Sequence, residues 1–78
     1  MSLIDAAYEQ IARDDGTVVA WLRNVHVTRE LARRTDALPL DSSGAYAVVV
    51  YDPNTDAIES VQAPLGFTQA KEAYRAAR

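Results

Sequence analysis

Side chains that could carry out catalysis are few in this sequence. His26 is its single histidine, and as a general base it would need a nucleophile such as Ser42 or Ser43 and an orienting carboxylate such as Glu30 or Asp36. Nothing in the spacing of these residues predicts that they meet. The glycine patterns of phosphate-binding loops and nucleophile elbows are also missing from the chain. We therefore expect a protein that is not an enzyme.

Carboxylates in two places suggest a calcium site, because hard cations prefer clustered oxygen ligands. They are the pair Asp14-Asp15 and the segment Asp52-Pro53-Asn54-Thr55-Asp56. The second segment lacks the regular ligand spacing, the central glycine and the terminal glutamate of a calcium-binding loop. The chain has no cysteine and one histidine, so the usual zinc ligands are missing as well. We expect neither a metal nor another cofactor.

The elements that would position any site begin with an antiparallel β-hairpin, predicted over residues 45–62. Its first strand is the β-branched run Ala45–Tyr51 and its second is Ala57–Gln62. Between them, Asp52 can accept a backbone hydrogen bond, the proline that follows presets φ, and Asp56 takes the position where a left-handed residue closes such loops. Turn chemistry and strand composition thus indicate the same structure.

An N-terminal helix is expected before the hairpin, because four apolar residues repeat at the spacing of one helical face. They are Ile4, Ala7, Tyr8 and Ile11, and Asp14-Asp15-Gly16 would end the helix with a left-handed glycine.

A second helix is expected at the C-terminal end, capped by Thr68. Its apolar side would consist of Phe67, Ala70, Tyr74 and Ala77. The proline-containing stretches 36–44 and 63–66 are expected to be connecting loops.

Residues 17–36 allow two interpretations. The one we favour is a short helix over Thr17–Asn24, followed by a second helix over Arg29–Thr35 that Thr28 caps. The alternative is a third strand at residues 17–22 beside the hairpin, favoured by Thr17-Val18-Val19. A third strand would also stabilise a hairpin that is marginal when isolated.

Length and composition fit one small α+β domain over residues 1–78. Hydrophobic residues make up 49% of the chain and charged residues 24%, which are ordinary globular values. No basic segment precedes a long apolar run, and no apolar stretch approaches about 18 residues. We expect no signal peptide, no membrane span and a cytoplasmic location.

The net charge of -3 weighs against a nucleic-acid binder, because such proteins neutralise phosphates with many Lys and Arg side chains. The charge is also unevenly distributed. Residues 39–65 contain Asp41, Asp52, Asp56 and Glu59 and no basic residue, whereas residues 16–38 and 66–78 are each net basic. The acidic hairpin region is therefore a candidate surface for a basic partner.

Residues 28–38 bear a resemblance to a known family. Thr28-Arg29-Glu30-Leu31-Ala32-Arg33-Arg34-Thr35-Asp36-Ala37-Leu38 resembles the first helix and turn of a helix-turn-helix protein, with Ala32 as the small packing residue and the hairpin as a wing. The resemblance implies DNA binding, with Arg29, Arg33 and Arg34 on phosphates. Asp36 stands where the family has glycine, and residues 39–44 are short for a recognition helix.

We predict a small non-catalytic protein-binding modulator, such as a phage-encoded inhibitor of a host enzyme or defence complex. Its partner would be another protein, for example a nucleic-acid-handling complex whose basic surface the four carboxylates occupy by mimicking phosphate. Trp21 and Tyr46 are the aromatic candidates for partner contact. Tyr46 and Tyr51 should lie on opposite faces of their strand.

Two alternatives remain. One is a self-associating structural protein, a homodimer joined through the hairpin edge or the Trp21 face. The other is the winged-helix-like DNA-binding protein that the helix-turn-helix resemblance implies.

Overall fold

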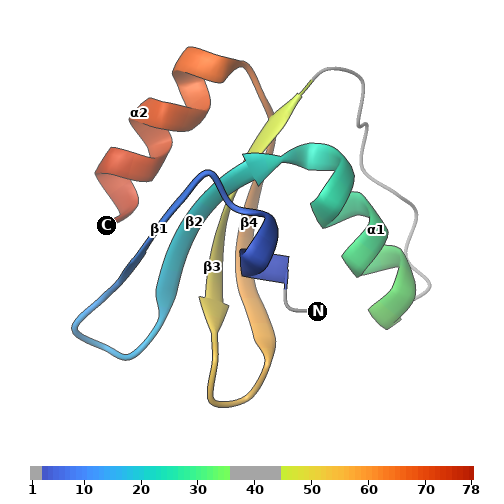
Figure 1. Cartoon of the computed structure of the whole chain (residues 1–78), viewed down its shortest axis with the longest axis vertical. Helices are drawn as coiled ribbons and strands as arrows, with labels where there is room; N and C mark the ends of the chain where they lie inside the picture. Colours follow the sequence, from blue (N-terminus) through green and yellow to red (C-terminus); the bar gives the residue numbers. More distant parts are fainter. Residues whose placement is uncertain (1–2, 36–44) are drawn as a thin grey trace.

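A computed structural model describes residues 3–35 and 45–78 (Figure 1). The elements in chain order are the 3-10 helix η1 (Leu3–Ala6), β1 (Glu9–Ala12), β2 (Val18–Arg23), α1 (Asn24–Thr35), β3 (Tyr46–Asp52), β4 (Ala57–Leu65) and α2 (Phe67–Ala77). The strands form one four-stranded sheet in the order β1-β2-β3-β4, and each neighbouring pair is antiparallel. The α+β class predicted from the sequence is confirmed, as are the hairpin and the C-terminal helix.

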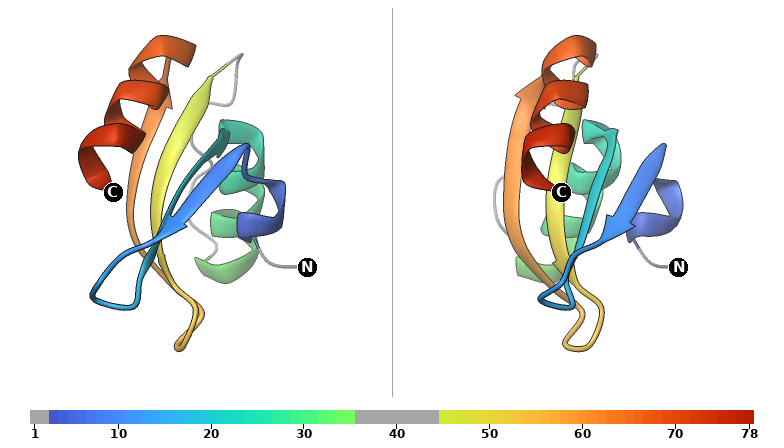
Figure 2. Two further views of the ribbon diagram at one scale, coloured as in Figure 1. Left: turned by 60° about the vertical axis from the view of Figure 1, so that its left-hand side comes forward. Right: turned by 90° about the vertical axis from the view of Figure 1, so that its left-hand side faces the viewer.

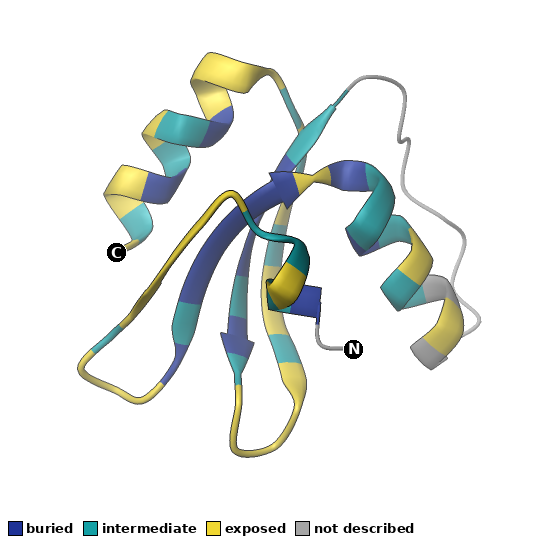
Figure 3. Ribbon diagram, in the orientation of Figure 1, coloured by how far each residue is buried: buried dark blue, intermediate teal, exposed yellow. Residues whose placement is uncertain are grey.

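The sheet lies between helices, with α1 and η1 on one face and α2 on the other (Figure 2). The central strands β2 and β3 are therefore buried on both sides, as Figure 3 shows. On the α1 face, the core contains Leu3, Ala20, Leu22, Val27, Ala47 and Val49. On the α2 face, it contains Val19, Trp21, Val48, Ala70 and Tyr74. Tyr46 packs against the α2-face cluster, and Tyr51 is buried; that the two lie on opposite faces stays a prediction.

The favoured helix over residues 17–24 is wrong, and the alternative strand is right. Residues 18–23 form β2, which pairs with β3 so that Val19 lies opposite Val50 and Trp21 opposite Val48. Because β2 is buried on both faces, its apolar residues run continuously and lack the alternation that marks a half-buried strand. The helix predicted from residue 29 begins earlier, at Asn24, so Thr28 lies within α1 and is not its cap.

The predicted N-terminal helix is also wrong. Only the single turn η1 is helical, and residues 9–12 form the edge strand β1, with Glu9 opposite Trp21 and Ile11 opposite Val19. Pairing with β1 satisfies backbone groups of β2 that would otherwise form a sheet edge. Asp14-Asp15-Gly16 reverses the chain, with Gly16 at φ +88, so the left-handed glycine closes a β-turn region and does not end a helix.

The β3–β4 hairpin confirms the predicted turn chemistry. Oδ1 of Asp52 accepts a hydrogen bond from the backbone N–H of Asn54 at 2.9 Å, and Asp56 has φ 57, in the left-handed region. The second strand continues to Leu65, so most of the loop predicted at 63–66 belongs to β4. The cap of α2 is Gly66, whose N–H donates to Oε1 of Gln69 at 2.9 Å, and not the predicted Thr68.

Candidate functional site

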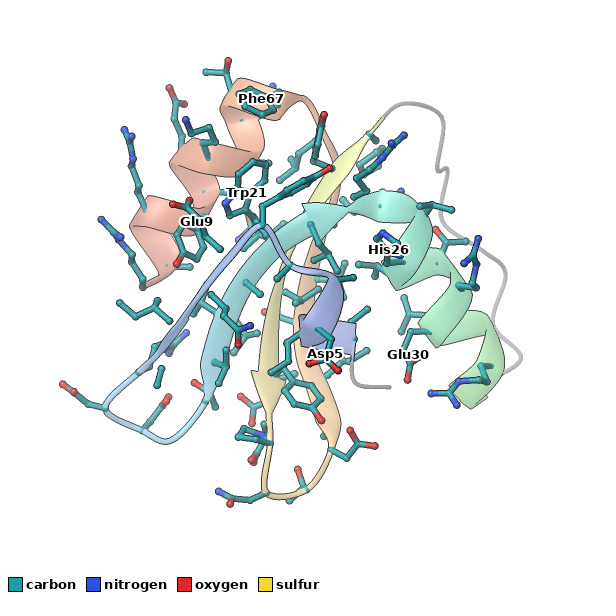
Figure 4. All side chains as sticks on the ribbon, in the orientation of Figure 1. Asp5, Glu9, Trp21, His26, Glu30 and Phe67 are labelled. Atoms are coloured by element: carbon teal, nitrogen blue, oxygen red, sulfur yellow. The ribbon has the colours of Figure 1, made fainter. Side chains whose placement is uncertain are left out.

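Four aromatic side chains from distant parts of the chain meet on the α2 side of the sheet. We call Tyr8, Trp21, Tyr46 and Phe67 the aromatic cluster. The ring centroids of Tyr8 and Trp21 are 4.8 Å apart, and the Phe67 centroid is 5.5 Å from those of Trp21 and Tyr46, in edge-to-face geometry. Figure 4 labels Trp21 on β2 and Phe67 at the start of α2. These separations and tilts are those at which aromatic pairs attract each other.

The cluster has a buried base and an exposed rim. Trp21 is 5% exposed, whereas Tyr8 and Phe67 are 53% and 51% exposed, the highest values among the large hydrophobic side chains that the structure describes. The indole Nε1 of Trp21 donates a hydrogen bond to Oε2 of Glu9 at 2.8 Å. The Trp21 ring is thus held by packing and by a polar bond, and it supports two rings that face solvent.

Strand pairing explains why these four residues meet. The backbone N–H of Tyr8 donates to the carbonyl of Trp21 at 3.0 Å, which fixes the start of β1 beside β2. Tyr46 lies opposite Leu65 at the end of the hairpin. Because α2 begins two residues after Leu65, Phe67 lies at the same end of the sheet. The cluster therefore depends on the register of three strand pairs.

Basic side chains adjoin the aromatic cluster along α2. Nζ of Lys71 lies 5.4 Å from the Phe67 ring centroid, and Cζ of Arg78 lies 5.7 Å from that of Tyr74. Both distances are within the range of cation–π attraction. Glu9, Lys71, Tyr74, Arg75 and Arg78 line a pocket of about 240 Å³ between β1 and α2. The surface beside the two exposed rings is therefore mainly cationic.

The six residues predicted for partner binding do not form one site. Trp21 and Tyr46 are both in the aromatic cluster. Asp52, Asp56 and Glu59 lie at the turn end of the hairpin, and since Tyr46 and Asp52 are the first and last residues of β3, the two groups lie at opposite ends of that strand. Asp41 is outside the described residues.

Two of the three described carboxylates have roles in the turn. Asp52 accepts from the Asn54 backbone, and Asp56 accepts a hydrogen bond from the hydroxyl of the buried Tyr51. Glu59 is exposed on β4. Turn formation therefore accounts for the positions of Asp52 and Asp56 without a partner.

The arginines of the helix-turn-helix resemblance lie on α1, across the sheet from the aromatic cluster. Arg29 and Arg33 are exposed, and Arg33 forms an ion pair with Glu30 at 2.7 Å. The side chain of Arg34 and the whole of residues 36–44, where a turn and recognition helix would follow, are outside what the structure describes. α1 itself packs on the sheet beneath it through Val27 and Leu31.

Of the residues considered for catalysis, the structure describes His26 and Glu30. His26 and Glu30 lie one turn apart on α1 (Figure 4), while Asp36, Ser42 and Ser43 are outside the described residues. Within residues 3–35 and 45–78, no group of three or more His, Asp or Glu side chains is arranged to hold a metal ion. In the same part of the chain, no helix has the length and apolar character needed to cross a membrane.

Tyr8 and Phe67 are surface residues that the sequence does not reveal. The apolar spacing predicts both on the buried faces of helices. No local pattern could have identified them, because their exposure follows from β1 being a strand and from α2 beginning at Phe67.

Comparisons of this chain with protein-family models, with curated proteins and with solved structures found no significant match.

Proposed function

We propose that this chain is a small non-catalytic protein that binds another protein stoichiometrically through the aromatic cluster. The observation that carries the proposal is the pair of exposed rings, Tyr8 and Phe67, supported by the buried Trp21. Aromatic side chains contribute more than most residues to the energy of protein interfaces, particularly where they are packed on a rigid base.

Preorganisation makes this surface a good binding site. Tyr8 and Phe67 each contact Trp21 and Tyr46, so partner binding would immobilise side chains whose freedom is already restricted. Ordering a free side chain at an interface costs about 0.5–1.5 kcal/mol. A partner that covers the two rings would gain their burial with little of that cost.

The biological form we propose is an inhibitory modulator, such as a phage-encoded inhibitor of a host enzyme or defence complex, acting in the cytoplasm. A small protein that presents one rigid hydrophobic surface needs no chemistry of its own to block a larger protein. The absence of cysteine from the sequence fits a reducing compartment. The acidic end of the hairpin would also bind a basic, nucleic-acid-handling partner. Glu59 would contribute most, because Asp52 and Asp56 already accept hydrogen bonds within the hairpin.

Affinity capture with the tagged protein tests the proposal. We expect one protein partner at a stoichiometric ratio, retained at high salt because the contact is mainly apolar. Tyr8→Ser and Phe67→Ser should each weaken binding at least about ten-fold, which corresponds to about 1.4 kcal/mol. The control is Arg29→Gln, an exposed change on α1, across the sheet from the aromatic cluster.

Three results would contradict the proposal. Binding that both serine variants retain would rule out the aromatic cluster as the contact. Recovery of the chain with itself alone would support the self-associating alternative. Recovery of nucleic acid that high salt removes would support the DNA-binding alternative.

A further inference from the structure

The outer edge of β1 is open to solvent. β1 is the first strand of the sheet, all four of its residues are exposed, and no strand lies on its outer side among residues 3–35 and 45–78. Such an edge offers backbone donors and acceptors to an added strand.

Register identifies which backbone groups face outward. The N–H of Arg13 donates to the carbonyl of Thr17 at 2.8 Å, and Ile11 and Glu9 continue that register opposite Val19 and Trp21. In an antiparallel pair, residues whose backbone groups bond the partner strand alternate with residues whose backbone groups point to the other side. The N–H and C=O groups of Gln10 and Ala12 therefore point away from β2. These two residues are the ones that would bond an additional strand.

Cationic side chains of α2 and of its C-cap residue lie near β1 on the α2 face of the sheet. Lys71, Arg75 and Arg78 lie four and then three residues apart, on one side of the helix, and line the pocket that Glu9 borders from β1. The helix itself packs over β2 and β3, so these long side chains extend from it toward β1. The one carboxylate in this pocket, Glu9, accepts the Trp21 indole hydrogen bond at 2.8 Å, so part of its charge is already engaged.

We call the open edge of β1 together with the pocket lined by Glu9, Lys71, Arg75 and Arg78 the groove. We propose that the groove binds an extended acidic segment of the partner protein, which pairs with β1 as an additional strand. The inference rests on the proposed function and names the chemistry of the partner. Alternate residues of an added strand would point toward α2 with a spacing of about 6.8 Å. Cations four residues apart on a helix are about 6 Å apart along its axis, so Asp or Glu at every second position would match them. Lys71 also contacts Phe67, which joins the groove to the aromatic cluster.

A second copy of this chain fits the groove less well. If two β1 edges paired antiparallel, the α2 faces of both sheets would lie on the same side. The two rows of cations would then come close together and repel each other. A nucleic acid also fits poorly, because it has no backbone amides with which to form the strand pairing that the open edge of β1 offers.

The test is selection of peptides of about twelve residues from a random displayed library against the folded protein, followed by binding measurements on the enriched peptides. We expect Asp or Glu at alternate positions in these peptides. Lys71→Gln combined with Arg75→Gln should weaken their binding at least about ten-fold. The matched control, Arg29→Gln combined with Arg33→Gln on α1, should leave affinity unchanged.

Backbone pairing has its own readout. N-methylation of alternate peptide residues should abolish binding in one register and leave it unchanged in the other, because only one set of amides faces β1. In amide NMR spectra, Gln10 and Ala12 should shift more than Glu9 and Ile11.

Several results would overturn the groove proposal. They are failure to enrich acidic peptides, affinity that the α2 substitutions leave unchanged, equal sensitivity to both methylation registers, and stronger binding of single-stranded DNA than of any peptide. If these occur while Tyr8→Ser and Phe67→Ser still abolish capture of a partner, the groove proposal fails and the proposed function stands. If acidic peptides bind as expected but the serine variants capture the partner normally, the aromatic contact fails instead.

Discussion

The indole N–H of Trp21 and the carboxylate of Glu9 are joined by a hydrogen bond of 2.8 Å that links the buried strand β2 to the edge strand β1. The two residues are also direct partners in the β1–β2 register. This bond satisfies the polar atom of a nearly buried ring and adds a side-chain link to the backbone pairing of β1 with β2. The same carboxylate borders the cationic groove, so one contact connects the aromatic cluster to the groove.

Glu9→Ala should destabilise the fold by about 1 kcal/mol, because it leaves the buried indole N–H without this acceptor. Glu9→Gln retains a side-chain oxygen at the same position and should cost less than about 0.5 kcal/mol. Urea denaturation, followed by the fluorescence of the single tryptophan, measures both changes. Equal losses for the two variants would show that the charge of Glu9, and not the hydrogen bond, stabilises this contact.

The turn residue Asp56 combines a left-handed backbone with the hydrogen bond from Tyr51. Asp56→Ala should cost about 2 kcal/mol, because alanine disfavours this φ and cannot accept the hydrogen bond. Asp56→Gly relieves the backbone but loses the acceptor, so its cost should be about 1 kcal/mol smaller. Asp56→Asn tolerates the conformation and keeps an oxygen, and should stay within about 0.5 kcal/mol of the parent. Chemical denaturation ranks the three, and a different order would contradict these roles.

Leu22 and Ile11 distinguish the observed fold from the helix predicted at the N-terminal end. Leu22 is 0% exposed in the core on the α1 face, so Leu22→Ala should cost about 3 kcal/mol. Ile11 is 41% exposed on the edge strand, and Ile11→Ala should cost less than about 1 kcal/mol. Thermal or urea unfolding measures both. A loss at Ile11 as large as that at Leu22 would mean that Ile11 is a core residue.

The β1–β2 turn should make a small contribution to acid sensitivity. The Thr17 hydroxyl, followed by the Thr17 backbone N–H, holds the pKa of Asp15 below its ordinary value, and Arg13 lowers it further. The corresponding distances from Asp15 Oδ1 are 2.5 Å to the hydroxyl oxygen and 3.0 Å to the backbone nitrogen. Because the pKa of Asp15 is lower in the folded than in the unfolded state, its contacts with Thr17 stabilise the fold fully above the unfolded pKa, about 4. This stabilisation is lost as the pH falls through the folded pKa.

Asp15→Asn should therefore narrow the difference in unfolding free energy between about pH 7 and about pH 2.5. Asp14→Asn is the control, because it removes the same charge from the neighbouring position and leaves the Thr17 hydrogen bonds intact. Denaturant titrations at the two pH values measure the effect. An unchanged difference for Asp15→Asn would show that the Thr17 contacts do not favour the charged form.

Local chemistry made part of this fold predictable. The β3–β4 hairpin follows from Asp52 and Asp56, whose roles in the turn depend on residues close by in the chain. The helix over 67–77 follows in the same way from a continuous stretch of helix-compatible residues, although its cap at Gly66 was not foreseen. Such elements can be predicted because the interactions that define them are between near neighbours.

The N-terminal region shows the limit of that reasoning. Ile4, Ala7, Tyr8 and Ile11 have helical spacing, yet Ile4 and Ala7 pack on the α1 face while Tyr8 contacts Trp21 on the α2 face. Pairing with β2 divides the stripe between the two sides of the sheet. Four apolar residues are compatible with either structure, and the choice depended on a strand that is distant in sequence.

Tertiary structure decided how the candidate site is assembled. The sequence identified Trp21 and Tyr46 as aromatic candidates and residues 39–65 as acidic, but it could not place Tyr8 and Phe67 beside the first pair or separate that pair from Asp52 and Asp56. The sequence by itself determined the α+β class, the hairpin and the C-terminal helix, because local turn chemistry and periodicity specify them. Only the tertiary structure decided which rings are exposed and which cations border β1, because these depend on strand register and on the position of α2 over the sheet.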